Sequence, residues 1–78
     1  MTLRTYQEIR DRIYTYARQH GLRPDWIEHS KSVRLLLLYN NERVVVGRAM
    51  VPIRDLRPET LTALAHALEP VFGKDWLE

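Results

Sequence analysis

The stretch that decides the fold reads Val33-Arg34-Leu35-Leu36-Leu37-Leu38-Tyr39, then Asn40-Asn41-Glu42-Arg43, then Val44-Val45-Val46-Gly47-Arg48-Ala49-Met50-Val51. Two apolar runs joined by a short polar segment predict a β-hairpin, and asparagines tolerate the positive φ angles of tight hairpin loops. Successive side chains of a strand point to opposite faces. Because the runs are continuous, this hairpin has apolar groups on both faces.

The register of the hairpin depends on the length of its loop. With a two-residue loop, Leu37 faces Val44, and each face then has its own set of side chains. One set is Val33, Leu35, Leu37, Val44 and Val46; the other is Arg34, Leu36, Leu38, Arg43, Val45, Gly47 and Ala49. A three-residue loop shifts the cross-strand partners, and the sequence leaves this choice open.

A helix is predicted before the hairpin. Thr5 and Glu8 have the spacing of a capping box, and an alternative start lies one turn earlier at Thr2. Apolar residues then recur at helical spacing and form one stripe: Leu3, Tyr6, Ile9, Ile13, Tyr16 and Ala17. Gly21 is expected to end the helix in the left-handed conformation.

The segments on either side of the hairpin complete the predicted fold. Before it, residues 26–29 predict a short strand after a linker at 23–25, and after it Pro52 is expected to end the last strand. A second helix is predicted to begin near 55–59 and to be stopped or kinked at Pro70. Its buried stripe would be Leu61, Leu64, Ala65 and Leu68, and the tail would fold back on the core through Val71, Phe72, Trp76 and Leu77.

We therefore predict a single α+β domain over residues 1–78, with an antiparallel sheet packed on two helices. The order is α-β-β-β-α, or α-β-β-α if the strand at 26–29 is absent. Two helices, each about 10 Å wide, cover one face of three strands spaced about 4.8 Å apart. The other face is predicted to stay open, and we place Leu36, Leu38 and Val45, or their register equivalents, on it.

Composition excludes several classes of protein. The chain has no cysteine, which rules out a disulfide framework and favours a reducing compartment, so we expect a cytoplasmic location. Residues 1–8 lack the apolar core of a signal peptide. The longest apolar run, 35–39, is far shorter than the roughly 20 residues that a membrane helix needs. We expect no membrane segment.

Catalytic chemistry is not indicated. The histidines at positions 20, 29 and 66 have no close spacing, and no pair has the spacing of metal ligands on a helix. We expect no catalytic residue, no metal and no cofactor, and therefore not an enzyme.

Nucleic-acid binding is the alternative function, because residues 1–54 carry ten basic and five acidic side chains, whereas residues 55–78 carry two and five. A basic surface would combine Lys31, Arg34, Arg43 and Arg48 with Tyr39 as a stacking group. The element order also resembles that of double-stranded RNA-binding domains, which hold phosphates with lysines at the start of their last helix. The matching segment here, 55–59, has two carboxylates and one arginine, so none of that family's binding residues is carried over.

The predicted function is that of a small non-catalytic protein-binding module. Its partner would be a second copy or a larger protein, held by the open sheet face and the edge strand at 44–46. The predicted partner-binding residues are Arg34, Leu36, Leu38, Arg43, Val45 and Arg48. Compact chains without catalytic motifs are typical of regulators and inhibitors, including the anti-CRISPR proteins of phages and mobile elements, a comparison that rests on size alone.

Overall fold

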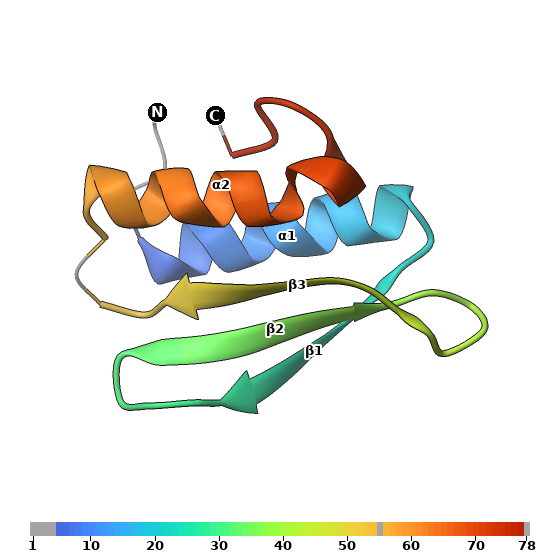
Figure 1. Ribbon diagram of the computed structural model, residues 1–78, viewed down its shortest axis with the longest axis horizontal. Helices are drawn as coiled ribbons and strands as arrows, with labels where there is room; N and C mark the ends of the chain where they lie inside the picture. Colours follow the sequence, from blue (N-terminus) through green and yellow to red (C-terminus); the bar gives the residue numbers. More distant parts are fainter. Residues whose placement is uncertain (1–4, 55, 78) are drawn as a thin grey trace.

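The computed structural model describes residues 5–54 and 56–77. Its elements follow the order predicted with three strands, as Figure 1 shows. They are α1 (Tyr6–Gln19), β1 (Arg23–Glu28), β2 (Val33–Tyr39), β3 (Val45–Pro52) and α2 (Pro58–Phe72). The predicted strand at 26–29 is thus confirmed as part of β1, which also takes up the predicted linker at 23–25.

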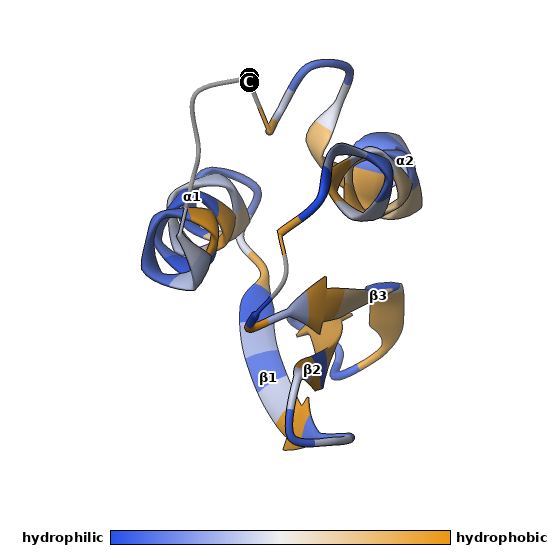
Figure 2. Ribbon diagram, turned by 90° about the vertical axis from the view of Figure 1, so that its left-hand side faces the viewer, coloured by the Kyte–Doolittle hydropathy of each residue, from blue (hydrophilic) through white to orange (hydrophobic). Residues whose placement is uncertain are grey.

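The three strands form one antiparallel sheet in the order β1-β2-β3. Figure 2 shows both helices on the same side of this sheet, with α1 beside β1 and α2 above β3. No other element of the described chain lies over the opposite side. The prediction that two helices cover one face and leave the other open is therefore confirmed.

The first helix begins at the predicted capping box. The Thr5 side chain accepts a hydrogen bond from the Glu8 amide at 3.1 Å, and the Glu8 carboxylate accepts one from the Thr5 amide at 3.1 Å. Ile9, Ile13 and Ala17 face the core. The helix ends before Gly21, whose φ of 68° lies in the left-handed region as predicted. The alternative start at Thr2, and Leu3 of the apolar stripe, lie outside the described residues.

The hairpin loop is longer than either predicted loop and spans residues 40–44. The two-residue register is wrong, because Leu37 pairs with Arg48 rather than with Val44. The Asn40 side chain organises the loop by accepting hydrogen bonds from the Glu42 and Val44 amides at 2.8 and 3.0 Å. Positive φ occurs in this loop at Arg43 (63°) rather than at either of the asparagines, which tolerate it better.

A β-bulge interrupts the pairing of β2 with β3. Leu38 pairs with Gly47 and Tyr39 with Val45, so Val46 is the extra residue. At a bulge two residues of one strand stand opposite one residue of its partner, which interrupts the regular alternation of side chains. Val45 and Val46 are accordingly both exposed. Pro52 ends β3, as predicted.

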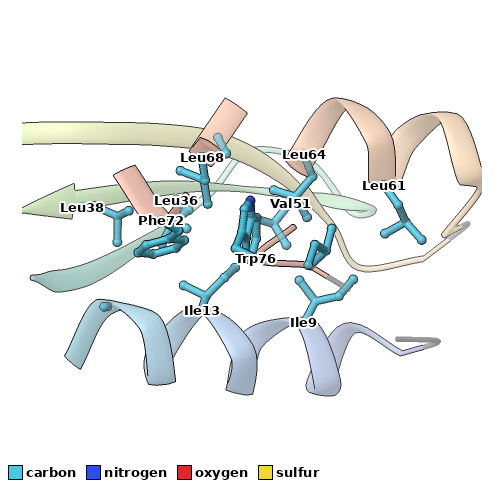
Figure 3. Close-up of a cluster of buried hydrophobic side chains, with 13 residues drawn as sticks. Ile9, Ile13, Leu36, Leu38, Val51, Leu61, Leu64, Leu68, Phe72 and Trp76 are labelled. Carbon is cyan, nitrogen blue, oxygen red and sulfur yellow. The ribbon is translucent and has the colours of Figure 1, made fainter. Parts of the chain in front are cut away.

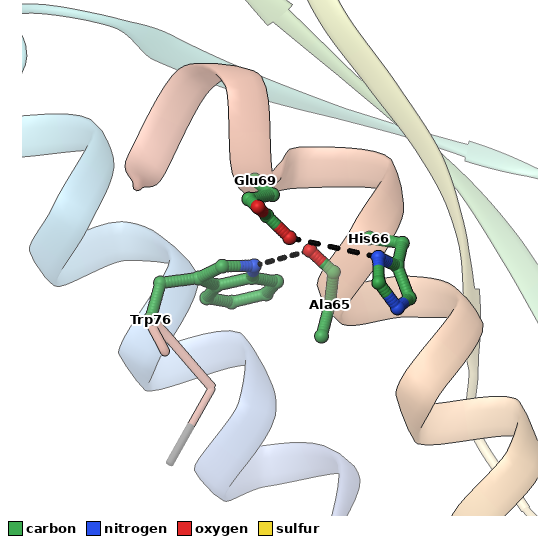
Figure 4. A network of polar contacts seen from close by, with 4 residues as sticks. All are labelled: Ala65, His66, Glu69 and Trp76. Carbon is green, nitrogen blue, oxygen red and sulfur yellow. Dashed lines mark hydrogen bonds and ion pairs between the residues drawn. The ribbon is translucent and has the colours of Figure 1, made fainter. Parts of the chain in front are cut away.

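The second helix begins at Pro58, within the predicted range 55–59, of which Asp55 lies outside the described residues. Pro70 does not stop the helix, which continues through it to Phe72. Beyond Gly73 the tail turns back, and Trp76 inserts between the two helices (Figure 3). Its indole N–H donates to the Ala65 carbonyl at 2.9 Å (Figure 4), and its own carbonyl accepts from Arg12 at 2.9 Å. The predicted folding back of the tail is confirmed.

Along β2, and at Gly47 and Ala49 of β3, the two faces of the sheet are the reverse of what we predicted. Leu36 and Leu38 are fully buried, at 0% exposure, on the side that the helices cover. The reason lies in β3, where the small residues Ala49 and Gly47 stand opposite these leucines. A Cβ atom at Gly47 would lie 2.8 Å from a methyl carbon of Val71. The helix-facing side is therefore the one whose side chains are small enough for α2 to approach.

Candidate protein-binding face

The uncovered side of the sheet is the candidate functional site, and we call it the open face. It carries alternate side chains of the three strands together with those of the β3 bulge. They are Arg23, Asp25 and Ile27 of β1, Val33, Leu35, Leu37 and Tyr39 of β2, and Val45, Val46, Arg48 and Met50 of β3.

The middle of the open face is apolar. Leu35 lies between Ile27 on β1 and Met50 on β3, which are 42% and 44% exposed. Val45 and Val46 extend the apolar surface toward the hairpin loop, at 43% and 42% exposure. Among the described residues, every large hydrophobic side chain with such exposure belongs to the sheet or to the hairpin loop. The most exposed large apolar side chains of the described residues are therefore gathered on the sheet and its hairpin loop.

Opposite charges flank this apolar centre. The register places Asp25, Leu37 and Arg48 in one row across the three strands, so the carboxylate and the guanidinium stand on opposite edges of the sheet. Both charged side chains are exposed. Within residues 5–54 and 56–77, neither takes part in an ion pair. Their charges are consequently available to a partner.

The structure divides the predicted partner-binding residues among four places. Leu36 and Leu38 belong to the core, so their predicted accessibility is wrong. Val45 and Arg48 lie on the open face. Arg34 lies on the helix-facing side, where its guanidinium carbon is 5.6 Å from the centre of the Tyr6 ring and one of its nitrogens donates to the Tyr6 hydroxyl at 3.3 Å. Arg43 lies in the hairpin loop.

The basic residues considered for nucleic-acid binding do not share one surface. Lys31 is in the β1–β2 turn, Arg34 is on the helix-facing side, and Arg48 is on the open face. Of these four cations, Arg43 alone lines the hollow of about 470 Å³ at the loop end, which Tyr39, Arg23 and Asp25 also line. A phosphate groove needs cations on one continuous surface. The arrangement of these four cations does not provide one.

Both outer strands have unpaired edges, and they differ in chemistry. On β1, Pro24 has no N–H to donate, which weakens that edge as a template for another strand. On β3 the only proline is Pro52, at the very end. An unpaired edge without proline can add a strand from another chain. The β3 edge lacks an internal proline, but the bulge at Val46 interrupts it, and bulges also protect edge strands from pairing.

The histidines lie in separate surroundings. His20 stacks on Tyr16, with ring centres 6.5 Å apart, and His29 is exposed between β1 and β2. His66 lies near Glu69 on the outer side of α2, with 3.5 Å between Nδ1 of His66 and Oε2 of Glu69 (Figure 4). The neighbouring Thr62 hydroxyl donates to the Pro58 carbonyl at 2.8 Å rather than to His66. This pair is exposed to solvent, and within the described part of the chain no hydroxyl donates a hydrogen bond to it.

A second hollow lies between α2 and the tail. It measures about 500 Å³ and has an apolar floor that includes Leu61, Ala65 and Leu77. His66, Glu69, Lys74 and Asp75 stand around it, so the charges at its rim are mixed. No group of three or more metal-ligating side chains occurs among the described residues.

Comparison with known proteins adds no family: no protein-family model, no curated protein and no solved structure matches the chain. No helix in the described residues is long and apolar enough to cross a membrane.

Sequence reasoning missed the central residues of the open face, namely Ile27, Leu35, Leu37 and Met50, as well as the charged residue Asp25. Alternation along β2 had grouped Leu35 with Leu37 correctly, but had assigned them to the covered side. A usable signal was present in β3. Gly47 and Ala49 are the small residues that a helix needs beneath it, and they share a face with Leu36 and Leu38.

Proposed function

We propose that this chain is a non-catalytic protein-binding module whose open face is the contact surface. One observation carries the proposal. The described large hydrophobic residues that remain most exposed are Ile27, Val44, Val45, Val46 and Met50, and all belong to the sheet or its hairpin loop. Scattered exposed apolar residues are ordinary, but a contiguous group on one face marks an interaction site.

The charges around this group support a protein partner over a nucleic acid. The open face combines an apolar centre with one carboxylate and two guanidinium groups, those of Asp25, Arg23 and Arg48. An apolar centre with a polar rim is the usual anatomy of a protein–protein interface. Phosphate contacts require a surplus of cations on one surface, which the distribution of Lys31, Arg34, Arg43 and Arg48 does not supply.

A module of this kind acts by occupying a surface of its target. Its role as a regulator or inhibitor, including an anti-CRISPR-like one, stays a prediction that rests on chain length and the lack of catalytic motifs. The absence of enzymatic activity is part of the same proposal. The solvated His66–Glu69 pair is consistent with it.

Site-specific photo-crosslinking in the native host tests the contact surface. Met50→p-benzoylphenylalanine places a photoreactive group on the open face, and Ala67→p-benzoylphenylalanine places the same group on the exposed side of α2. We expect protein adducts from position 50 in much higher yield than from position 67. Adding Leu37→Lys should abolish them, because a lysine there puts a charge into the apolar centre.

The matched control for that lysine is Ala63→Lys, on the exposed side of α2. It adds the same charge away from the open face, so the adducts should persist. Equal adduct yields at positions 50 and 67 would contradict the proposal. Adducts at position 50 that nuclease removes would favour the nucleic-acid alternative instead.

A further inference from the structure

Resting on the proposed function, we infer that the open face binds a second copy of this chain, face to face, around a two-fold axis that runs along the strands. In such a dimer β2 lies over β2 of the second copy, and β1 lies over its β3. The inference follows from how apolar and charged side chains are distributed across the sheet. The open face is complementary to itself under this one rotation.

The complementarity is seen row by row. In the row Asp25–Leu37–Arg48, the rotation leaves Leu37 on the axis and exchanges the two edges. Asp25 of each copy then meets Arg48 of the other, which gives two equivalent ion pairs. In the next row, Leu35 stays on the axis while Ile27 of each copy meets Met50 of the other. In these two rows apolar groups therefore meet apolar groups, and Asp25 and Arg48 meet opposite charges. In the row Arg23–Tyr39–Val45, Arg23 of each copy stands opposite Val45 of the other, at the edge of the sheet, where a long arginine side chain can extend into water.

Other symmetric arrangements lack this match. A two-fold axis that runs across the strands, over the same row, places β1 over β1 of the second copy. Asp25 would then meet Asp25, and Arg48 would meet Arg48, both repulsive pairs. Pairing of the two β3 edges leaves Asp25 on the far edge of each sheet, with no role in the contact. Each arrangement therefore predicts a different response to reversal of these charges.

The size of the face predicts the strength of the dimer. Three strands spaced about 4.8 Å apart and about six residues long cover a footprint of about 300 Å². A standard stable interface buries about 800 Å² per partner. Because the footprint is smaller, we expect a reversible dimer with a dissociation constant in the micromolar range or weaker. Its assembly has to be measured up to high protein concentration.

Sedimentation equilibrium of the purified full chain, from micromolar to millimolar concentration, tests the arrangement. Asp25→Arg and Arg48→Asp should each weaken the dimer by about tenfold or more, because symmetry turns both ion pairs into repulsive pairs. The double variant Asp25→Arg/Arg48→Asp should dimerise as the original chain does. An equimolar mixture of the two single variants should form a mixed dimer, since both contacts are then between opposite charges.

The control is Glu28→Arg, which reverses a charge on the same strand but on the helix-facing side. It should leave the dissociation constant unchanged. Circular dichroism checks that the variants fold. We expect that they do, because the substituted side chains are exposed. A chain that stays monomeric at millimolar concentration would overturn the dimer, and so would a dimer that Asp25→Arg leaves intact. In either case, adducts to a different protein at position 50 would leave the proposed function standing.

Discussion

Arg43 adopts a conformation that few side chains tolerate. Its φ of 63° lies in the left-handed region, where an L-residue other than glycine is strained by about 1–2 kcal/mol. The loop enforces this conformation through the Asn40 side chain and the hydrogen bond from the Arg43 amide to the Asn40 carbonyl at 3.0 Å. The strain is thus offset by contacts elsewhere in the loop.

We expect Arg43→Gly to raise the free energy of unfolding by up to about 1 kcal/mol, because glycine adopts positive φ without strain. Chemical denaturation monitored by circular dichroism measures the change. Asn41→Gly is the matched control, since Asn41 is not among the described residues with positive φ. There glycine only adds freedom to the unfolded chain, so stability should fall. Stabilisation by Asn41→Gly instead would contradict the loop conformation.

The hairpin loop shows which features of single residues could be predicted from the sequence and which could not. The identities of Asn40 and Asn41 were enough to predict a turn, because asparagine is common in turns. They did not fix which residue adopts positive φ. That choice depends on how the five-residue loop folds, which the identities of two residues do not determine. The register error comes mainly from the length of this loop, since Tyr39 pairs with Val45, and the bulge at Val46 adds one further residue of shift.

At the scale of the elements, the packing of α1 against α2 depends on the tail that follows α2. Trp76 is 1% exposed and lies between α1 and α2, where its ring packs edge-on against Phe72 with centres 5.2 Å apart. It also joins the helices through hydrogen bonds to Ala65 and from Arg12. The other tryptophan, Trp26, is only half-buried at the seam between α1 and β1 and donates to the Tyr14 hydroxyl at 3.0 Å. The two side chains differ mainly in burial.

Trp76→Ala should therefore lower the free energy of unfolding by about 3–5 kcal/mol, the range for fully buried aromatic side chains. Trp26→Ala should cost clearly less, because part of its ring already contacts water. Thermal and urea unfolding of both variants compare the two losses. A smaller loss at Trp76 than at Trp26 would mean that the tail does not hold the helices together in solution.

Elements were predicted better than their packing, and the hairpin shows why. Caps, apolar periodicity and proline positions are local signals, and they located α1, β1, the hairpin and α2 to within a few residues. Which face of the hairpin meets the helices is a tertiary choice. In β2 both faces are equally apolar, so the choice falls to β3, where Gly47 and Ala49 let α2 approach. The candidate site was therefore placed on the wrong leucines although the open face itself was foreseen.

At the scale of the whole molecule, this assignment of faces separates the residues that hold the fold from those available for binding. The core includes Leu36, Leu38 and Val51 on the sheet and closes against both helices and the tail. The open face contributes apolar side chains that the fold does not bury completely. Neighbouring positions along β2 should consequently have opposite tolerance to charge.

We expect Leu38→Lys to unfold the protein and Leu37→Lys to leave it folded. A buried, unpaired ammonium costs several kcal/mol, a large share of the roughly 4–12 kcal/mol that a domain of this length has in total. At position 37 the lysine stem lies along the open face and its ammonium reaches water, so the free energy of unfolding should change by only about 1 kcal/mol. Leu38→Met, which keeps the volume, is the control and should cost less than about 1.5 kcal/mol. Circular dichroism with urea titration distinguishes these outcomes. A folded Leu38→Lys beside an unfolded Leu37→Lys would mean that the helices cover the other face, and both proposals for the open face would then fail together.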